Sequence, residues 1–318
     1  MNRATRSIAV VLGVAIVIGA CGTAGDSAGG VADEVIEDQR AALLAAFESN
    51  PFGPQSPRDI ESTAGTNPVT FDEAPQLTEM NLCNIHFHEG AEHRGGEFTT
   101  YAGNGDGEGH GTGYLFDGDL TEDELAPYDG EVGRTEDGDL QPGDTIEIHY
   151  VHSTDDIVPG PTLGSCLASD ASTPALRVEA QVFVLVNDES AASLVDLTAI
   201  DDVDGYHQAV NIPTDTGAPV NYAGSTTGPS FNEEGSGFQV SWSVRPNVVK
   251  VHIGSVQEWF EDNPFDEEYA HAVRNLVINE ALVMVMSVVM AGDLGVALDG
   301  RHRLLRQHLE FVERPRHG

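Results

Sequence analysis

The sequence feature that most constrains the fold is a pair of stretches in which histidines alternate with apolar residues. The first stretch covers residues 84–93 and the second covers residues 146–152. Successive side chains of a β-strand point to opposite faces, so His86 and His88 are expected on one face and the apolar residues beside them on the other. The second stretch alternates in the same way and presents His149. Both stretches are therefore predicted to be strands with one polar and one apolar face.

Three imidazoles from two neighbouring strands suit an open zinc site, in which water takes the fourth position of a tetrahedron. Glu147 lies two residues before His149 and shares its face, where it could accept the remaining N–H of a ligand imidazole. An isolated histidine is more often an ordinary hydrogen-bonded core residue. The combination of H-x-H with E-x-H favours a metal, which we predict to be Zn²⁺, with Co²⁺ or Cd²⁺ as possible substitutes.

The charge balance excludes some classes of partner. The 318-residue chain has a formal net charge of −37, from 52 acidic and 15 basic residues. Such a field repels nucleic acid and anionic membrane surfaces, so no nucleic-acid binding is predicted. Because 40% of the residues are hydrophobic and strand patterns are clear, the body of the chain is not expected to be disordered. Nothing in the sequence specifies an oligomeric state.

Residues 1–20 have the pattern of a signal peptide that is removed on export. Arg3 and Arg6 precede an apolar run at residues 8–18, which is too short for a comfortable membrane span. The run leads to Cys21, which resembles the lipid-carrying cysteine of a bacterial lipobox; a plain secretory signal with a chance cysteine is the alternative. We therefore predict an exported, cell-surface or periplasmic lipoprotein that touches the membrane only through a lipid anchor at Cys21.

Two other cysteines remain, Cys83 and Cys166. One pair of cysteines in an exported protein favours a disulfide between them, because the compartment is oxidising. Cys83 lies three residues before His86, so such a bridge would brace the predicted metal strand. The alternative is two separate buried thiols.

The rest of the chain divides into a flexible tether, a main domain and an extension. The tether is predicted at residues 21–35, the main domain at 36–278, and an apolar and then basic C-terminal extension of unknown role at 279–318. The extension could be packed, disordered or a second membrane helix, although Asp293 and the glycines argue against a span. The Gly-rich stretch at 103–111 is expected to be a solvated turn, because it lacks the spacing of an EF-hand calcium loop.

Many strand signals and few helical ones predict a mainly β domain. An amphipathic helical pattern spans residues 32–49, and another helix is expected to begin at residue 255. Strands are expected near residues 81–89, 145–152, 176–186, 238–244 and 248–253. The last two are predicted to pair with each other across Arg245-Pro246-Asn247.

The two histidine stretches resemble motifs of the carbonic anhydrases. H-F-H at residues 86–88, followed by E-I-H-Y-V-H at 147–152, is similar to the α-class pattern H-F-H and E-x-H-x-V-H. The wording of the first motif, C-N-I-H-F-H-E-G-A-E-H, is most similar to the δ-class and its bacterial relatives. Further resemblances follow in the same order, over roughly residues 50–275: Q-S-P at 55–57, A-E-H at 91–93, Y-A-G-S-T-T-G-P at 222–229 and V-S-W at 240–242.

This resemblance implies a zinc lyase that interconverts CO₂ and bicarbonate. It implies a mainly β (α+β) fold with a central, largely antiparallel or mixed twisted sheet and a few peripheral helices. In such a site His86, His88 and His149 hold zinc, and Glu147 and His93 support the ligands from behind. The resemblance further implies that Thr227 accepts a hydrogen bond from the metal-bound hydroxide and that Glu92 accepts one from Thr227; Thr226 replaces Thr227 if the register slips by one.

The sequence departs from the α-class in ways that leave two roles open. The segment before His86 is shorter, and in the α-class that region carries the proton-shuttle histidine; here His93, His110 and His152 are only candidates, so turnover could depend on buffer. Val182, Val184 and Trp242 are candidates for an apolar CO₂ wall or for plain core. The alternative function is a non-catalytic metal-binding or carbonic-anhydrase-like surface lipoprotein, against which the Thr227–Glu92 pair argues.

Overall fold

The computed structural model describes residues 30–135, 138–169, 172–226 and 233–285. The predicted signal peptide, Cys21, Thr227 and the extension beyond residue 285 lie outside these residues, so export and lipidation stay predictions. Within the described ranges, no helix has both the length and the apolar character needed to cross a membrane.

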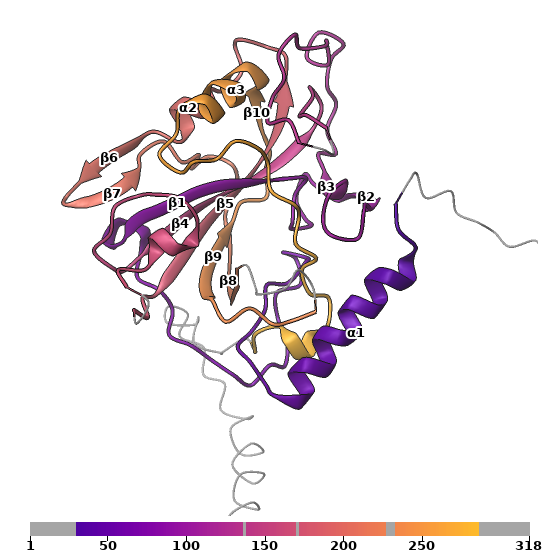
Figure 1. The fold of residues 1–318 in the computed structure, drawn as a ribbon, viewed down its shortest axis with the longest axis vertical. Coiled ribbons are helices and arrows are strands. Elements are labelled where there is room, and N and C mark those ends of the chain that lie inside the picture. Colours follow the sequence, from indigo (N-terminus) through magenta and orange to yellow (C-terminus); the bar gives the residue numbers. More distant parts are fainter. Residues whose placement is uncertain (1–29, 136–137, 170–171, 227–232, 286–318) are drawn as a thin grey trace, which may run out of the picture.

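A six-stranded twisted sheet forms the centre of the molecule, as Figure 1 shows. The mainly β prediction is therefore confirmed, and the three strands expected nearest the histidines form as predicted. Five of the strands lie in the spatial order β1 (Asn81–Glu89), β4 (Thr145–Ser153), β5 (Leu176–Val186), β9 (Gln239–Val244) and β8 (Val220–Ser225). The sixth strand, β10 (Val249–His252), pairs with β5.

The predicted pairing of the last two strands with each other is wrong. Instead, β9 and β10 both run parallel to β5 on the same edge, one after the other. β9 pairs with the first half of β5 and β10 with the second half, because β5 has 11 residues and is long enough for both. Pro246 lies between β9 and β10 and has no N–H for a ladder, so the strand breaks there without reversing.

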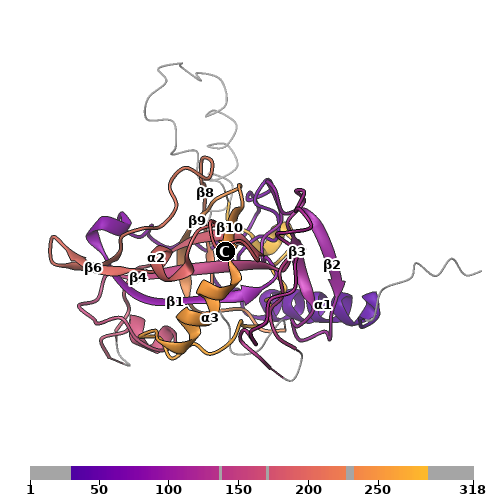
Figure 2. The same cartoon turned by 90° about the horizontal axis from the view of Figure 1, so that it is seen from above.

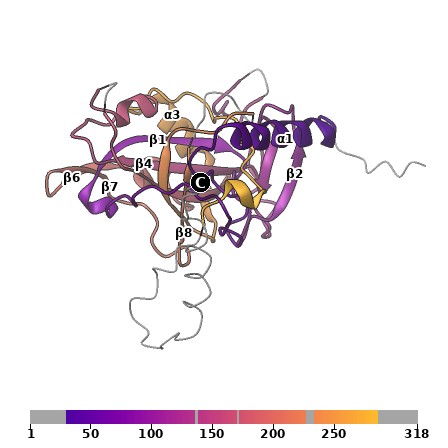
Figure 3. The same cartoon turned by 90° about the horizontal axis from the view of Figure 1, so that it is seen from below.

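Smaller elements surround the sheet. The described residues form two hairpins and three α-helices: β2 (Thr100–Asn104) with β3 (Thr112–Leu115), β6 (Ile200–Val203) with β7 (Tyr206–Ala209), α1 (Asp33–Ser49), α2 (Leu194–Leu197) and α3 (Ile253–Glu261). Three short 3₁₀ turns complete the set: η1 (Leu77–Glu79), η2 (Leu163–Cys166) and η3 (Glu280–Leu282). The Gly-rich stretch forms the turn between β2 and β3, and α1 runs alongside it (Figure 2 and Figure 3), where Gln39 donates to the Gly107 carbonyl.

The two faces of the sheet bury different sets of side chains. One face carries Ile85 and Phe87 of β1 and packs against α3 through Trp259. The opposite face has a second apolar cluster that includes Val182 and Trp242. Since alternate residues of β1 point to opposite faces, His86 and His88 project into the second layer, where the site lies.

The folded body is longer than the predicted domain of residues 36–278. α1 begins at Asp33, within the predicted tether. It buries Leu43 and Phe47 against Leu282 and Val283, which belong to the segment assigned to the extension. Residues 279–285 are therefore part of the packed body, because their apolar side chains close the core beneath α1.

Candidate metal centre

The pairing of β1 with β4 gathers three imidazoles in one place. His86 stands directly opposite His149 in the antiparallel ladder, and His88 stands opposite Glu147. The ring centroids are 5.2 Å apart for His86 and His149, and 4.8 Å apart for His88 and His149. One ring nitrogen of each imidazole lies within 4.8 Å of the other two, and all three residues are buried. This spacing fits three ligands of one metal ion.

Each imidazole has one ring nitrogen held by an acceptor. The N–H therefore sits on the held nitrogen, and the lone pair of the other nitrogen is free to bind a metal. That free nitrogen is Nε2 in His86 and His88, and Nδ1 in His149. The acceptors are Asn84 Oδ1 for His86 Nδ1 at 2.6 Å, the Ala272 carbonyl for His88 Nδ1 at 2.8 Å, and Glu147 Oε1 for His149 Nε2 at 2.9 Å.

Burial keeps the imidazoles of His86 and His88 in the neutral form that binds metals. It lowers the pKa of His88 to about 4 and, together with the nearby His149 and His88 rings, lowers the pKa of His86 well below its usual value. A metal ion binds only the deprotonated nitrogen, so a neutral imidazole has no proton to lose before it coordinates. Three clustered imidazoles, of which His86 and His88 are held neutral, thus form a donor set that fits zinc.

Glu147 accepts a hydrogen bond from His149, the kind of contact that its position in the sequence predicts. Its Oε1 also accepts from His93 Nδ1 at 2.6 Å, and its Oε2 accepts from the His93 backbone N–H at 3.1 Å. Burial acts to raise the pKa of Glu147, but the contacts with His93 and His149 outweigh it and hold that pKa well below the usual range. His93 continues the chain of hydrogen bonds to the Tyr222 hydroxyl at 2.5 Å. His93 therefore acts through Glu147 and does not reach the ligand nitrogens.

Glu92 lies beside the ligands and is fixed by a residue that the sequence did not point to. Its Oε1 accepts the backbone N–H of Arg274 at 2.7 Å, and its two oxygens lie 3.7 Å from His88 Nδ1 and 3.8 Å from His149 Nε2. The Arg274 guanidinium in turn donates to the carbonyl of Thr226 at 2.5 Å. Thr227, the predicted partner of Glu92, lies just outside the described residues.

A cavity of about 460 Å³ opens onto two of the three clustered histidines, His86 and His88. The side chains predicted as a CO₂ wall do not line it: Val182 lies in the core and Trp242 packs behind His149, with ring centroids 4.9 Å apart. Val184 is also absent from the lining. The residues that do line the cavity are Asn84, His86, His88, Thr162, Leu163, Gly164, Gly237, Phe238, Glu267 and His271.

His271 is a cavity residue that sequence reasoning missed. Its ring centroid lies 5.5 Å from that of His86, and its Nε2 meets Glu267 Oε2 at 2.5 Å. No strand or helix pattern surrounds it, and only its bridge to His88 in the folded chain places it here. The three histidines considered as shuttles, His93, His110 and His152, do not line this cavity.

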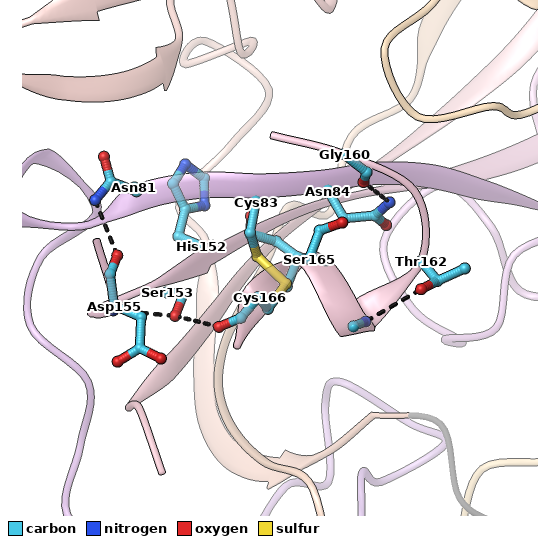
Figure 4. Close-up of a disulfide and its surroundings, with 12 residues drawn as sticks. Asn81, Cys83, Asn84, His152, Ser153, Asp155, Gly160, Thr162, Ser165 and Cys166 are labelled. Atoms are coloured by element: carbon cyan, nitrogen blue, oxygen red, sulfur yellow. Dashed lines mark hydrogen bonds between the residues drawn. A yellow bond between two sulfur atoms is a disulfide. The ribbon is translucent and has the colours of Figure 1, made fainter. Parts of the chain in front are cut away.

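The predicted disulfide between Cys83 and Cys166 is present, as Figure 4 shows. Cys83 sits where the register of β1 against β4 shifts, between Leu82 and Asn84, so its side chain can leave the strand toward η2. The bridge therefore joins the strand that carries two of the clustered histidines to a segment that lines the cavity.

His152 lies near the disulfide (Figure 4), fully buried, and makes stability depend on pH. Burial lowers its pKa from 6.5 to about 4. Between these values the unfolded chain takes up a proton that the folded chain does not, so the stability that this group contributes is complete above pH 6.5 and is lost as the pH falls to 4.

The free energy of unfolding of the wild type falls between pH 7 and pH 4 partly through His152. We expect this fall to be smaller by about 3 kcal/mol in His152→Gln. Denaturant unfolding of both proteins at the two pH values measures this difference. Equal acid losses in the two proteins would contradict the assignment.

One comparison with known proteins identifies a family for this chain. A family model described as Delta carbonic anhydrase matches residues 77–255, which is more than half of the chain. A search of curated proteins finds no match.

Three solved structures are similar to parts of this chain. An α-carbonic anhydrase from Thermovibrio ammonificans, in complex with the inhibitor sulfanilamide, has 15% sequence identity, covers 73% of this chain and 89% of its own, and gives a TM-score of 0.23. The α-carbonic anhydrase of Photobacterium profundum has 14% identity, coverages of 77% and 94%, and a TM-score of 0.23. A halotolerant carbonic anhydrase from Dunaliella salina has 16% identity, coverages of 72% and 85%, and a TM-score of 0.29.

The family match runs from η1 to the start of α3 and includes all six strands of the central sheet, among them the two that carry the clustered histidines. The buried group of His86, His88 and His149 lies inside the matched range. On this match, the chain belongs to the delta carbonic anhydrase family.

Proposed function

We propose that this protein catalyses the reversible hydration of CO₂ to bicarbonate and a proton, with Zn²⁺ held by His86, His88 and His149. The observation that carries the proposal is the arrangement of the three imidazoles. They are buried and close together, and each has its N–H engaged and its other nitrogen free. Family membership supports the choice of reaction.

Zinc in this position would act as a Lewis acid that lowers the pKa of a coordinated water to about 7, for which carbonic anhydrase is the established example. The chain itself fixes the direction of the three ligand nitrogens. Asn84, the Ala272 carbonyl and Glu147 each hold one imidazole in a single tautomer. Because these acceptors lie on the protein frame, the ligands need no rearrangement to bind the metal.

The cavity suits a small apolar substrate. Leu163 and Phe238 give it an apolar wall, while Glu267 and His271 give a polar one. CO₂ has no net charge or dipole and would be held by contacts with the apolar side. Bicarbonate carries a charge and is better solvated at the polar side, which favours its departure.

The proposal extends to Thr227 and Glu92 as the pair that orients the attacking oxygen. Arg274 connects the two positions, since its backbone N–H donates to Glu92 at 2.7 Å and its guanidinium to the Thr226 carbonyl at 2.5 Å. Thr226 immediately precedes Thr227 in the chain. This connection supports the pairing of Thr227 with Glu92.

Metal removal tests the reaction directly. We expect the full chain to hydrate CO₂ faster than buffer alone in stopped-flow measurements, to fall to the buffer rate after chelation, and to recover when Zn²⁺ is restored. The reason is that hydroxide would form at neutral pH in this site only from water bound to the metal. Zinc bound stoichiometrically without hydration above buffer would contradict the proposal and would favour a metal-binding protein without turnover.

A further inference from the structure

The segment at residues 160–166, here called the tethered loop, connects β4 to β5 and forms one wall of the cavity. Thr162, Leu163 and Gly164 of this loop line the same cavity as His86 and His88. The loop is distant in sequence from β1, yet three separate links fix it to that strand. Its position beside His86 and His88 is therefore set largely by β1, with one further hydrogen bond from Ser153 of β4 to the Cys166 carbonyl at 2.7 Å.

All three links converge on two consecutive residues of β1, Cys83 and Asn84; Figure 4 shows the disulfide and the hydrogen bond between Asn84 and Gly160. The disulfide joins Cys166 to Cys83 with a Cα–Cα distance of 4.9 Å. The Gly160 N–H donates to the Cys83 carbonyl at 3.0 Å. The Asn84 side-chain amide donates through Nδ2 to the Gly160 carbonyl at 3.1 Å. A covalent bond and two hydrogen bonds thus hold both ends of the loop.

Asn84 passes this attachment on to a metal ligand. Its Nδ2 faces the Gly160 carbonyl, so its Oδ1 must face the other way, where it accepts from His86 Nδ1 at 2.6 Å. A side-chain amide offers a donor on one side and an acceptor on the other. Without the Gly160 carbonyl, the Asn84 amide would lose the contact that fixes its orientation. In the reversed orientation, its NH₂ group would face His86 Nδ1.

The backbone of Thr162 indicates that the loop is held in place under constraint. Its φ of 59° and ψ of 170° lie in a region that is essentially restricted to glycine. A β-branched residue keeps such a conformation only where its surroundings determine it. Its hydroxyl oxygen accepts the Gly164 N–H at 3.2 Å, and the disulfide closes the loop at Cys166.

We propose that the tethered loop is a positioning element for the metal ligand His86, held by the Cys83–Cys166 disulfide and acting through Gly160 and Asn84. The disulfide thereby sets the affinity of the site for metal as well as the stability of the fold. This inference rests on the metal site of the proposed function and is independent of the reaction performed there.

Metal affinity in a set of variants tests the proposal. Chelator competition gives the zinc affinity, and the visible spectrum of the Co²⁺-loaded protein reports the ligand geometry. We expect Asn84→Ala to weaken zinc binding by about 10–100-fold, as for other groups that orient a ligand. Cys83→Ala with Cys166→Ala should weaken it about tenfold. The three substitutions together should weaken it no more than Asn84→Ala alone, because both act through one contact.

A matched control separates this effect from a general loss of stability. Leu43→Ala empties a buried position in the apolar cluster between α1 and η3, whose residues do not line the cavity at the site. We expect it to lower the stability of the protein and to leave zinc affinity and the Co²⁺ spectrum unchanged. If the disulfide variant keeps the wild-type zinc affinity, or if its loss multiplies with that of Asn84→Ala, the proposal is overturned.

Hydrogen exchange on the wild-type protein gives a test that needs no variant to fold. Coupling between two sites is reciprocal, so a loop that orients a ligand must itself be stabilised by metal. We expect zinc to slow amide exchange in residues 160–166 about tenfold and to leave α1 unchanged. Equal exchange of these loop amides with and without zinc would overturn the proposal. Tight zinc binding without CO₂ hydration would instead overturn the proposed function alone.

Discussion

His149→Ala is expected to abolish both zinc retention and CO₂ hydration. The substitution removes one of three ligands, and the two that remain, His86 and His88, both come from β1. Loss of a group that merely orients a ligand costs about 10–100-fold in metal affinity, so loss of a ligand should cost more than about 100-fold. Hydration should fall to the buffer rate, since too little zinc would stay bound.

Chelator competition and stopped-flow hydration, measured on the same samples, check this prediction. His152→Gln is the matched control, because His152 lies on the same strand, is equally buried, and does not line the cavity. It should retain zinc and hydrate CO₂ at the wild-type rate. If His149→Ala still binds zinc with wild-type affinity, the proposed ligand set is wrong.

Glu147→Gln is expected to destabilise the fold by about 3 kcal/mol, the upper end of the usual cost of leaving a buried hydrogen-bond donor without its acceptor. The carboxylate accepts hydrogen bonds from the His93 backbone, His93 Nδ1 and His149 Nε2. A glutamine has a single acceptor oxygen, so its NH₂ must face at least one of these donors. The residue is fully buried, and no solvent is present to relieve the clash.

The same substitution should weaken zinc binding by about 10–100-fold, because His149 loses the group that fixes its N–H on Nε2. Denaturant unfolding at pH 7 and chelator competition measure the two effects. Glu179→Gln is the control: Glu179 is another buried carboxylate, on β5, whose pKa is raised by burial, so its conversion to an amide should cost far less. Equal stability losses in the two variants would contradict the role assigned to Glu147.

The clustering of His86, His88 and His149 could be predicted from sequence because it depends on local periodicity. Alternation along a strand puts His86 with His88 and Glu147 with His149, whatever the rest of the chain does. The disulfide was predictable for a different reason, since only one pairing of Cys83 was available once Cys21 was set aside. To predict either feature, it is enough to recognise a single strand or a single pair of residues.

The remaining parts of the site depend on contacts that no local pattern records. The acceptor for His88 is the carbonyl of Ala272, and any residue type could supply it. His271 reaches the cavity because an irregular segment bridges to β1. The pairing of β9 and β10 with a single edge of β5 likewise depends on the length of β5 and on what covers it. Such arrangements follow from long-range packing, which periodicity does not encode.

The antiparallel register that places His86 opposite His149 affects the free energy of metal binding at the proposed site. The backbone ladder fixes the spacing of the ligands, and the imidazole directions are already set by acceptors in the same frame. Binding free energy is therefore not consumed in ordering the chain, in contrast to small domains that fold only around their ion. The site therefore selects ions by how well they match a spacing of the imidazoles that the sheet sets before any ion binds.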